Sequence, residues 1–547
     1  MSLALCAPRC VAVILFSLSA SATAQSLHTV VVAQPAGRTQ VAASGRRLAI
    51  GGDGSLWAAV WQQDTAGNRT FQVARSSDGG INWQPPIDTS TTGDGAGAIA
   101  AGTGCDDLHV VWHATNGGSF TTAYHQVLDT RTGTWRGSPQ VLLAGTSSND
   151  QYSAADVAVT ASGSVVALVQ TNRQPPAPWT GSWNAGLMVK RRGQSQWQGP
   201  FQINIGNTGV RADIQVRGEV VHCAYRSAIG GYGIFYRRFD AEQLSWLDGG
   251  DVPVGPNGNA NLYASNANML ALDSAGDAYV LYSTGQATPG QGEVWLAHAS
   301  AGNYSSWSQQ KVYDDPPLTW GNTTFSFYSL TVQNDLVLVQ YSKAQDGNST
   351  LYQQGFAVGQ RVFGEVPLVT TTQTGRFTEV TGFRDTRSSG LSAIVNGTTA
   401  AAPAGIISVL LGGPAATTVA HGATCRGNLP NIPWLAANSL PQPGTTFHFE
   451  VSGVPPASPG VLLAGFACLP QPISLGFVGF TGCELQVSGV ATLGYAADAA
   501  GRHAFTLPVP AGSAVRGVTL QLQNFSIAAG ANPGGGVTTN SLAATVY

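Results

Sequence analysis

The sequence predicts an all-β protein built from many short strands, and three observations support this. Only 10% of the 547 residues are charged and 43% are hydrophobic. That composition supplies a core and lacks the charge typical of coiled coils, disordered tails and nucleic-acid binders. The 68 glycines and 29 prolines provide many turns. Short apolar runs recur along the chain, whereas no convincing amphipathic helix is present.

One apolar run recurs seven times, with starts 53 to 58 residues apart. The copies are SLWAAVW (55–61), LHVVWH (108–113), SVVALVQ (164–170), EVVHCAY (219–225), DAYVLY (277–282), DLVLVQY (335–341) and LSAIVN (391–396). Turn signals and one or two further strands separate them. Four short strands in each unit is the arrangement of a β-propeller blade. We therefore expect a propeller over residues 25–411 with seven blades, and six as the alternative.

The last unit has room for about three strands. Residues 28–34 (HTVVVAQ) precede the first unit and could supply the missing outer strand. That pairing would close the ring and remove an open sheet edge.

The N-terminus resembles an export signal. Residues 11–18 are apolar, and Ala22-Thr23-Ala24 fits a small-residue cleavage site. We expect residues 1–24 to be a signal peptide and the protein to be secreted. No later stretch is long enough to span a membrane. The net charge of −3 predicts no attraction to nucleic acid or to an anionic membrane.

Five cysteines follow this segment, and none has the spacing of a zinc site. Cys105 and Cys223 are expected in the β core. Two of Cys425, Cys468 and Cys483 are expected to form a disulfide, and the sequence leaves the pair open. No metal and no cofactor is predicted.

Residues 76–83 (SSDGGINW) resemble the Asp box, S-x-D-x-G-x-T-W, of sialidases and other BNR-repeat propellers. Ser76, Asp78, Gly80 and Trp83 match, and Asn82 replaces the threonine. The motif describes a hairpin turn in which the carboxylate accepts backbone amides and glycine permits positive φ. The resemblance implies a structural role for these residues, on the face opposite an active site.

The catalytic motif of sialidases is missing. Their Arg-Ile-Pro would fall near Ser44, where the sequence reads Ala42-Ala43-Ser44-Gly45. Arg46 and Arg47 are out of register. We therefore expect a sialidase-like fold without sialidase activity.

The predicted site is the rim opposite the Asp box, where loops follow the repeated strands. Aromatic side chains there are mixed with amides, which suits the apolar faces and hydroxyl edges of sugars. The alternative is that these rings pack between blades. The candidates for substrate binding are Trp179, Trp183, Tyr232, Tyr263 and Trp320.

His113, Tyr225 and Arg226 are the candidate catalytic residues, because each lies at or just after the end of a repeated strand. A His or Tyr base beside an Arg that neutralises a uronate is what a polysaccharide lyase requires. A carboxylate pair such as Asp150 with Asp213 would suit a glycoside hydrolase. A structural histidine remains the alternative for His113.

Residues 412–547 differ in style and predict a small β-sandwich, with period-2 strands between Gly and Pro turns. They resemble C-terminal modules of large secreted bacterial proteins and are expected to serve in attachment or sorting. We predict that the propeller recognises carbohydrate at its channel mouth, with cleavage left open. The alternatives are a polysaccharide lyase acting on a uronate-containing glycan and a non-catalytic adhesion propeller.

Overall fold

The structure is a computed structural model. It describes residues 28–546 except 34–37, 41–47, 65–68, 90–96, 103, 105, 116–120, 146–151, 172–178, 180–183, 204–211, 228–232, 256–262, 265–268, 274, 285–291, 316–327, 334–335, 346–347, 358, 372–377, 382–386, 389–390, 398–404 and 411–415. The expected signal peptide (1–24), the expected boundary at 411–412 and Cys105 lie outside this description. Within the described part, no helix has the length and apolarity needed to cross a bilayer.

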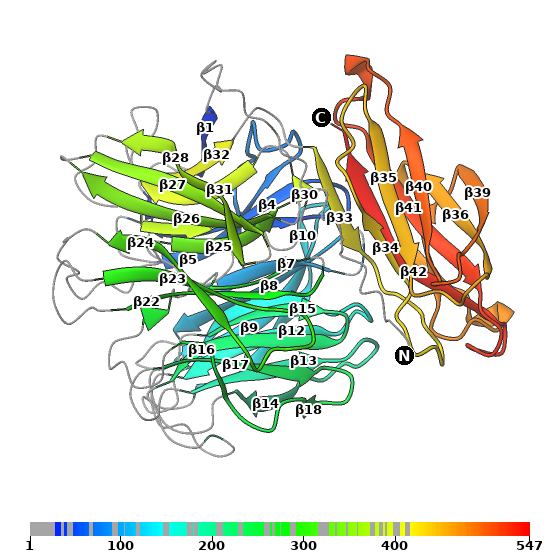
Figure 1. Cartoon of the computed structure of the whole chain (residues 1–547), viewed down its shortest axis with the longest axis horizontal. Coiled ribbons are helices and arrows are strands. Elements are labelled where there is room, and N and C mark those ends of the chain that lie inside the picture. The colour runs from blue at the N-terminus through cyan, green and yellow to red at the C-terminus, as the bar shows by residue number, and fades with distance from the viewer. Residues whose placement is uncertain are drawn as a thin grey trace, which may run out of the picture.

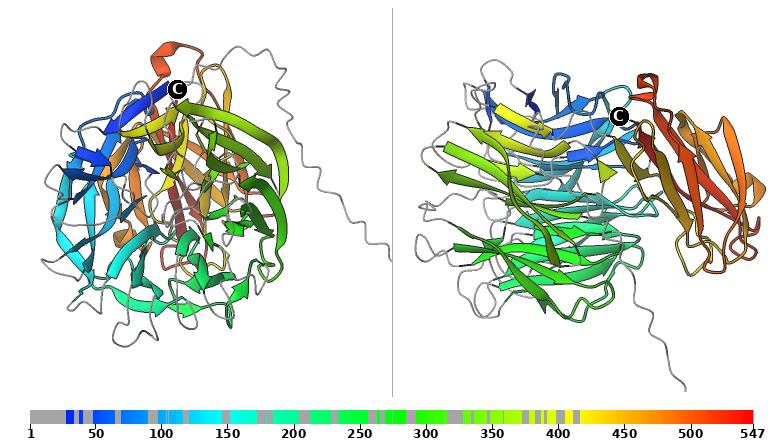
Figure 2. Two further views of the ribbon diagram at one scale, coloured as in Figure 1. Left: turned by 90° about the vertical axis from the view of Figure 1, so that its left-hand side faces the viewer. Right: turned by 45° about the horizontal axis from the view of Figure 1, so that its top comes forward.

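The described chain is all-β, as predicted, and residues 28–410 contribute seven antiparallel sheets that follow one another around a ring, the arrangement of a β-propeller (Figure 2). The first four sheets contain β2 (Arg38–Gln40), β3 (Leu48–Ile50), β4 (Leu56–Asp64), β5 (Arg69–Ser76) and β6 (Ile87–Asp88); β7 (Gly97–Ala101), β8 (Asp107–Thr115), β9 (Thr121–Asp129) and β10 (Thr134–Leu143); β11 (Tyr152–Val159), β12 (Val165–Thr171), β13 (Ala185–Lys190) and β14 (Gln198–Gln202); and β15 (Ala212–Arg217), β16 (Val220–Ser227), β17 (Gly233–Asp240), β18 (Ser245–Trp246) and β19 (Val252–Pro253).

The remaining three sheets of the ring contain β20 (Tyr263–Ala264), β21 (Leu270–Leu272), β22 (Ala278–Thr284), β23 (Gly292–Ala299) and β24 (Ser308–Asp315); β25 (Tyr328–Gln333), β26 (Leu336–Gln345), β27 (Asn348–Ala357) and β28 (Gln360–Thr371); and β29 (Thr378–Thr381), β31 (Leu391–Gly397), β32 (Gly405–Leu410) and β1 (His28–Ala33). The seven repeated runs correspond to β4, β8, β12, β16, β22, β26 and β31. Each is the second strand of its sheet, as expected.

The first strand of the chain completes the last sheet of the ring. β1 pairs antiparallel with β32, with His28 opposite Leu410 and Thr29 opposite Val409. The prediction that residues 28–34 supply the outer strand of the last unit is therefore confirmed for β1. This pairing joins the two ends of the ring through backbone hydrogen bonds.

The core of the ring lies between neighbouring sheets. Trp57 and Trp112 are fully buried between the first two sheets. Tyr225 and Phe239 are buried between the third and fourth. The strands are apolar on both faces because each sheet is covered on both sides.

Residues 76–83, which resemble an Asp box and are called the Asp box below, lie between β5 and β6, the third and fourth strands of their sheet. Asp78 accepts hydrogen bonds from the Asn82 backbone N–H at 2.9 Å and from the Ser76 hydroxyl at 2.8 Å. The Ser76 hydroxyl also accepts the Gly80 N–H at 2.9 Å. Partial burial disfavours the charged carboxylate, but the bonds from Asn82 and Ser76 hold the pKa of Asp78 below its ordinary value. The residues therefore act as a turn, which is the structural role that the motif predicts.

Residues 417–545, together with residues 387–388 from the segment between β29 and β31, form a β-sandwich with a two-stranded ribbon beside it. Its six-stranded sheet has the order β30 (Arg387–Ser388), β33 (Thr417–His421), β42 (Gly536–Thr545), β41 (Thr519–Ile527), β36 (Pro459–Gly465) and β39 (Ala491–Ala496). The other elements are β34 (Trp434–Ala437), β35 (Thr446–Ser452) and β40 (His503–Pro508) in one sheet, β37 (Ala467–Ser474) and β38 (Glu484–Ser488) in the ribbon, and the short 3-10 helices η1 (Gly476–Val478) and η2 (Ser513–Val515). We call this unit the C-terminal module.

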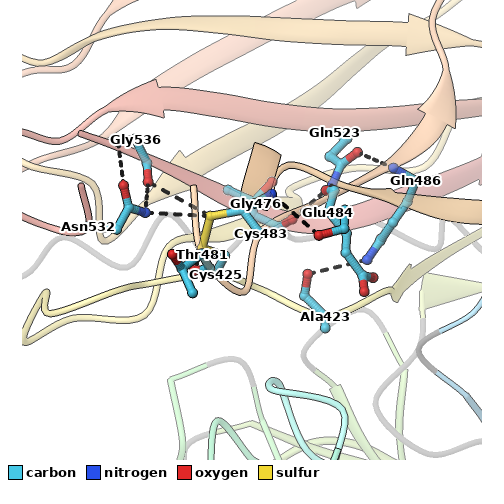
Figure 3. The surroundings of a disulfide bond; sticks show 12 residues. Ala423, Cys425, Gly476, Thr481, Cys483, Glu484, Gln486, Gln523, Asn532 and Gly536 are labelled. Atoms are coloured by element: carbon cyan, nitrogen blue, oxygen red, sulfur yellow. Dashed lines mark hydrogen bonds between the residues drawn. A yellow bond between two sulfur atoms is a disulfide. The ribbon is translucent and has the colours of Figure 1, made fainter. Parts of the chain in front are cut away.

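A disulfide joins Cys425 to Cys483 within the C-terminal module (Figure 3). Cys425 also forms a backbone bridge to Thr538 in β42. The expectation that two of the last three cysteines are bonded is confirmed, and the structure identifies this pair. Cys468 is disulfide-bonded too. Cys223 is free and buried in the propeller core, as predicted.

The C-terminal module is docked on one face of the ring (Figures 1 and 2). The contacting turns connect first to second strands or third to fourth strands, so all of them lie on the same face as the Asp box. The polar contacts are Gln521 Nε2 to the Gly52 carbonyl (2.6 Å), the Thr519 hydroxyl to the Asp53 carbonyl (3.2 Å), the Thr424 N–H to the Ala161 carbonyl (3.0 Å), and the ion pairs Arg426–Glu242 (2.7 Å) and Arg192–Glu484. Val419 of the module and Trp83 of the Asp box pack against one apolar cluster.

Two buried histidines, His109 and His125, lie on neighbouring strands of the second sheet. His109 Nδ1 and His125 Nε2 are 2.9 Å apart, so one ring donates to the other. Trp197 meets His125 edge-on, and Lys190 and Trp197 both donate to Gln140 beside it. Burial lowers the pKa of His109 to about 4 and the pKa of His125 well below its ordinary value. These rings are neutral parts of the core.

Removing the Asp78 carboxylate should destabilise the fold. We expect Asp78→Ala to lower the free energy of unfolding by about 1–3 kcal/mol, because the turn amides lose their acceptor. Urea denaturation followed by circular dichroism measures the loss. Asp78→Asn, which keeps an oxygen acceptor, should lose less. Equal stability of the alanine variant and the wild type would contradict the structural role.

Acid should weaken the fold through the buried histidines. Between about pH 4 and the ordinary histidine pKa of 6.5, the unfolded chain binds protons that the folded chain excludes, so stability falls as the pH drops. Urea titrations at several pH values should show this slope. It should be shallower, though not absent, in the double variant His109→Gln/His125→Gln, because His222 and His421 are buried with lowered pKa values as well. His448→Gln, at an exposed position, is the control. An unchanged slope in the double variant would refute the assignment.

Candidate functional site

The free rim of the propeller is the edge opposite the C-terminal module, where second strands end and third strands begin. Thr115 lies opposite Thr121 there, and Ser227 lies opposite Gly233. Strands in an antiparallel sheet alternate in direction, so this edge is the far end from the Asp-box turn. Every polar contact that we describe between module and ring is at the other end. The described contacts of the C-terminal module therefore leave the free rim uncovered.

His113 lies near the free rim on β8, opposite Ala123, and is half-buried. Side chains alternate along a strand, so His113 shares a face with Val111, whose side chain packs toward the third sheet. Trp179 and Tyr152 belong to that same apolar layer. The structure thus brings His113 and Trp179 to one inter-sheet layer at the rim.

Trp179 is held by tight packing. It is buried, and a Cβ at Gly186 would come within 2.7 Å of its ring. Glycine at this position lets the indole lie directly on β13. The Thr121 hydroxyl donates to the Tyr152 carbonyl at 2.6 Å and links the second and third sheets beside it. Trp179 therefore forms part of the wall beneath the rim.

Tyr225 points away from solvent. Its ring is fully buried and stacks on Phe235, with centroids 6.0 Å apart, in the layer between the third and fourth sheets. Burial, with the charge of Asp251 nearby, raises the pKa of Tyr225 well above its ordinary value. The phenol is therefore protonated at neutral pH, and its surroundings are those of a core residue.

Arg226 follows Tyr225 and faces the opposite side of the strand. It is half-buried and shares a face with Ala224, which packs toward the fifth sheet. Tyr225 and Arg226 thus lie in different layers, and the third sheet separates the layer of Tyr225 from that of His113. The structure gathers His113 with Trp179 but does not bring the three catalytic candidates into one layer.

The other sequence-predicted binding residues have less structural description. Trp183, Tyr232 and Trp320 lie outside the described residues. Tyr263 begins β20, where only the backbone is described. Their place at the rim stays a prediction.

The carboxylates have a structural arrangement. Asp213 is buried and accepts the Leu270 backbone N–H of the next sheet at 2.9 Å. Asp156, which the sequence reasoning did not single out, similarly accepts the Ile214 N–H at 3.4 Å. Both lie in first strands and tie neighbouring sheets together. Asp150, the suggested partner of Asp213, lies outside the described residues.

Polar residues near the rim extend the set found from sequence. Gln202 Nε2 donates to Asn184 Oδ1 at 2.9 Å, and the Asn184 N–H donates to the Thr171 hydroxyl at 3.1 Å. The one sequence feature that could have identified these residues is an amide side chain next to the end of a strand. Among the described residues, no group of three or more His, Cys, Asp or Glu could hold a metal ion.

Comparisons with known proteins give fold-level likenesses. No family model and no curated protein matches the sequence. Similar solved structures include an ulvan lyase bound to -[GlcA(1-4)Rha3S]- (11% identity, TM-score 0.43, covering 70% of this chain and 97% of that one) and a protein of unknown function from Dyadobacter fermentans (10%, 0.38, 70% and 98%). A Hadza microbial sialidase is similar over 60% of this chain and 66% of its own (14% identity, TM-score 0.35). Likenesses this distant do not bear on activity.

Proposed function

We propose that this protein is a secreted glycan-recognition propeller whose ligand binds at the free rim. The observation that carries the proposal is the position of the C-terminal module. Its contacts with the turns at Gly52, Ala161 and Glu242 occupy the face of the ring that holds the Asp box. Large ligands therefore reach the mouth of the central channel from the opposite rim.

Carbohydrate is the ligand class that the rim chemistry suits best. Trp179 and Asn184 are buried beneath the rim, with Asn184 bonded to Gln202, so these residues support the rim wall. The sequence adds Trp183 and Trp320 in loops of the same rim. Aromatic faces beside amides match the alternating apolar and hydroxylated surfaces of sugars.

Cleavage, if the site performs it, would best use His113 as the base. A polysaccharide lyase needs a group that takes the proton beside a uronate carboxylate, and a cation that stabilises the resulting charge. His113 is half-buried at the rim, whereas Tyr225 is buried and holds its proton at neutral pH. Arg226 is the cation that the sequence suggests, although its face of β16 packs toward the fifth sheet, away from the layer of His113. Tyr225 would then act through packing alone.

The test incubates the mature protein with polygalacturonate, alginate and chondroitin sulfate. Binding is measured by calorimetry, and cleavage by ultraviolet absorbance of unsaturated products and by release of reducing ends. For a lyase, His113→Ala should lower the rate by about 10²–10⁴-fold. For a binder, the same variant should weaken affinity by about tenfold or less. Tyr225→Phe should retain function in either case.

Arg131→Ala is the matched control for Arg226→Ala. Arg131 is an exposed arginine in the turn between β9 and β10, at the module-side end of its sheet. Its removal should leave glycan binding and cleavage unchanged. If Arg131→Ala abolishes binding while Arg226→Ala retains it, the ligand binds on the module side of the ring, and the proposed site at the free rim is wrong. Absence of binding to every polymer would overturn the carbohydrate proposal.

A further inference from the structure

β39 is the last strand of the six-stranded sheet in the C-terminal module. It pairs with β36 on one side, and the strand order ends there. The sheet extends outward from the ring, so β39 lies on the side of the module turned away from the propeller (Figure 1). No other described strand pairs with its outer edge, although at the end of β39 the Ala496 carbonyl already lies 3.0 Å from His503 Nδ1.

The side chains of β39 leave this edge unguarded. Its sequence, ATLGYA, holds no charge and no proline, and five of its six residues are exposed. Leu493 is 55% exposed at its centre, and Val490 beside it is 69% exposed. Exposed edge strands normally carry charges, proline or bulges, because an unguarded edge pairs with other chains.

Several other outer strands of the chain carry such guards, although β1 (HTVVVA) carries neither a charged residue nor a proline. The fourth strands of the propeller sheets carry Arg136 and Pro139 in β10, Pro200 in β14, Lys311 in β24, and Arg361, Glu365 and Pro367 in β28. β40, an edge of the second sheet of the module, ends in Pro508. β39 lacks these guards and exposes apolar side chains, and an unprotected edge of six residues is expected to be covered in the native protein.

We propose that β39 pairs antiparallel with β39 of a second copy and forms a dimer through a continuous sheet. A two-fold axis makes each strand face its own copy, so a charge at the residue on the axis would meet a like charge. A strand without charge avoids that repulsion and fits a copy of itself. This inference is independent of the proposed function.

The symmetry also selects a register. Hydrogen-bonded and non-hydrogen-bonded pairs alternate along an antiparallel ladder, so a two-fold axis must place one residue opposite itself. Leu493 is the residue that centres the exposed stretch 490–496. Pairing there sets the two Leu493 side chains against each other, with Val490 near each end of the paired stretch. The pairing covers the exposed leucines as well as the open backbone.

Sedimentation of the mature protein over a range of concentrations tests the dimer. The wild type should associate reversibly. Leu493→Lys and Leu493→Glu should each weaken the dimer by about tenfold or more, because each places like charges opposite one another. An equimolar mixture of the two variants should associate again, because lysine then faces glutamate. The mixing experiment distinguishes two explanations for weaker association of the single variants: like charges opposite one another at position 493, or simply the loss of apolar surface.

Val366→Lys is the matched control. Val366 is 45% exposed on β28, an outer strand that already carries charges, and its replacement should leave association unchanged. Hydrogen exchange of the wild type needs no variant and should show β39 amides slowing as concentration rises. The proposal fails if the wild type is monomeric at every concentration, or if both charged variants dimerise as tightly as the wild type.

Discussion

The pairing of β1 with β32 is the constraint on which the ring depends. It places the first strand of the chain beside strands formed some 380 residues later, with His28 opposite Leu410. Each sheet of the ring packs between two neighbours, so an open ring would leave a sheet face uncovered. Closure also fixes which ends of the strands share a rim. The module-side turns and the free rim are defined only because the ring is closed.

Docking of the C-terminal module then divides the two faces by role. Gln521 reaches the Gly52 carbonyl, and its oxygen faces the buried His421 at 2.9 Å, so the junction is a hydrogen-bonded interior rather than a loose contact. Val419 and Trp83 share an apolar cluster across it. Trp83 of the Asp box therefore packs against the apolar cluster on which the module docks. The same docking leaves the rim near His113 and Trp179 for ligand, while β39 lies on the far side of the module.

Sequence reasoning located the strands well because strand spacing and turn chemistry are local properties. The repeated runs are second strands, and Ser76, Asp78 and Gly80 form the expected turn. The direction of a side chain was harder to predict. Tyr225 and Arg226 end the same run, yet alternation sends them to opposite faces and leaves Tyr225 in the core. Asp213 is a backbone acceptor between sheets, which depends on a neighbour 57 residues away. The packing of Trp83 against the apolar cluster that Val419 also contacts depends on tertiary structure that no local pattern encodes.

Hydrogen exchange in the presence of glycan tests the central claim most directly, namely that ligand binds at the rim opposite the module. The mature protein is compared with and without polygalacturonate, alginate and chondroitin sulfate in turn. The account predicts slower exchange in peptides that end at His113 and Arg226 and in those that contain Trp179. It predicts no change in the module-side turns at Gly52, Ala161 and Glu242. Slower exchange confined to those turns or to the C-terminal module would contradict it.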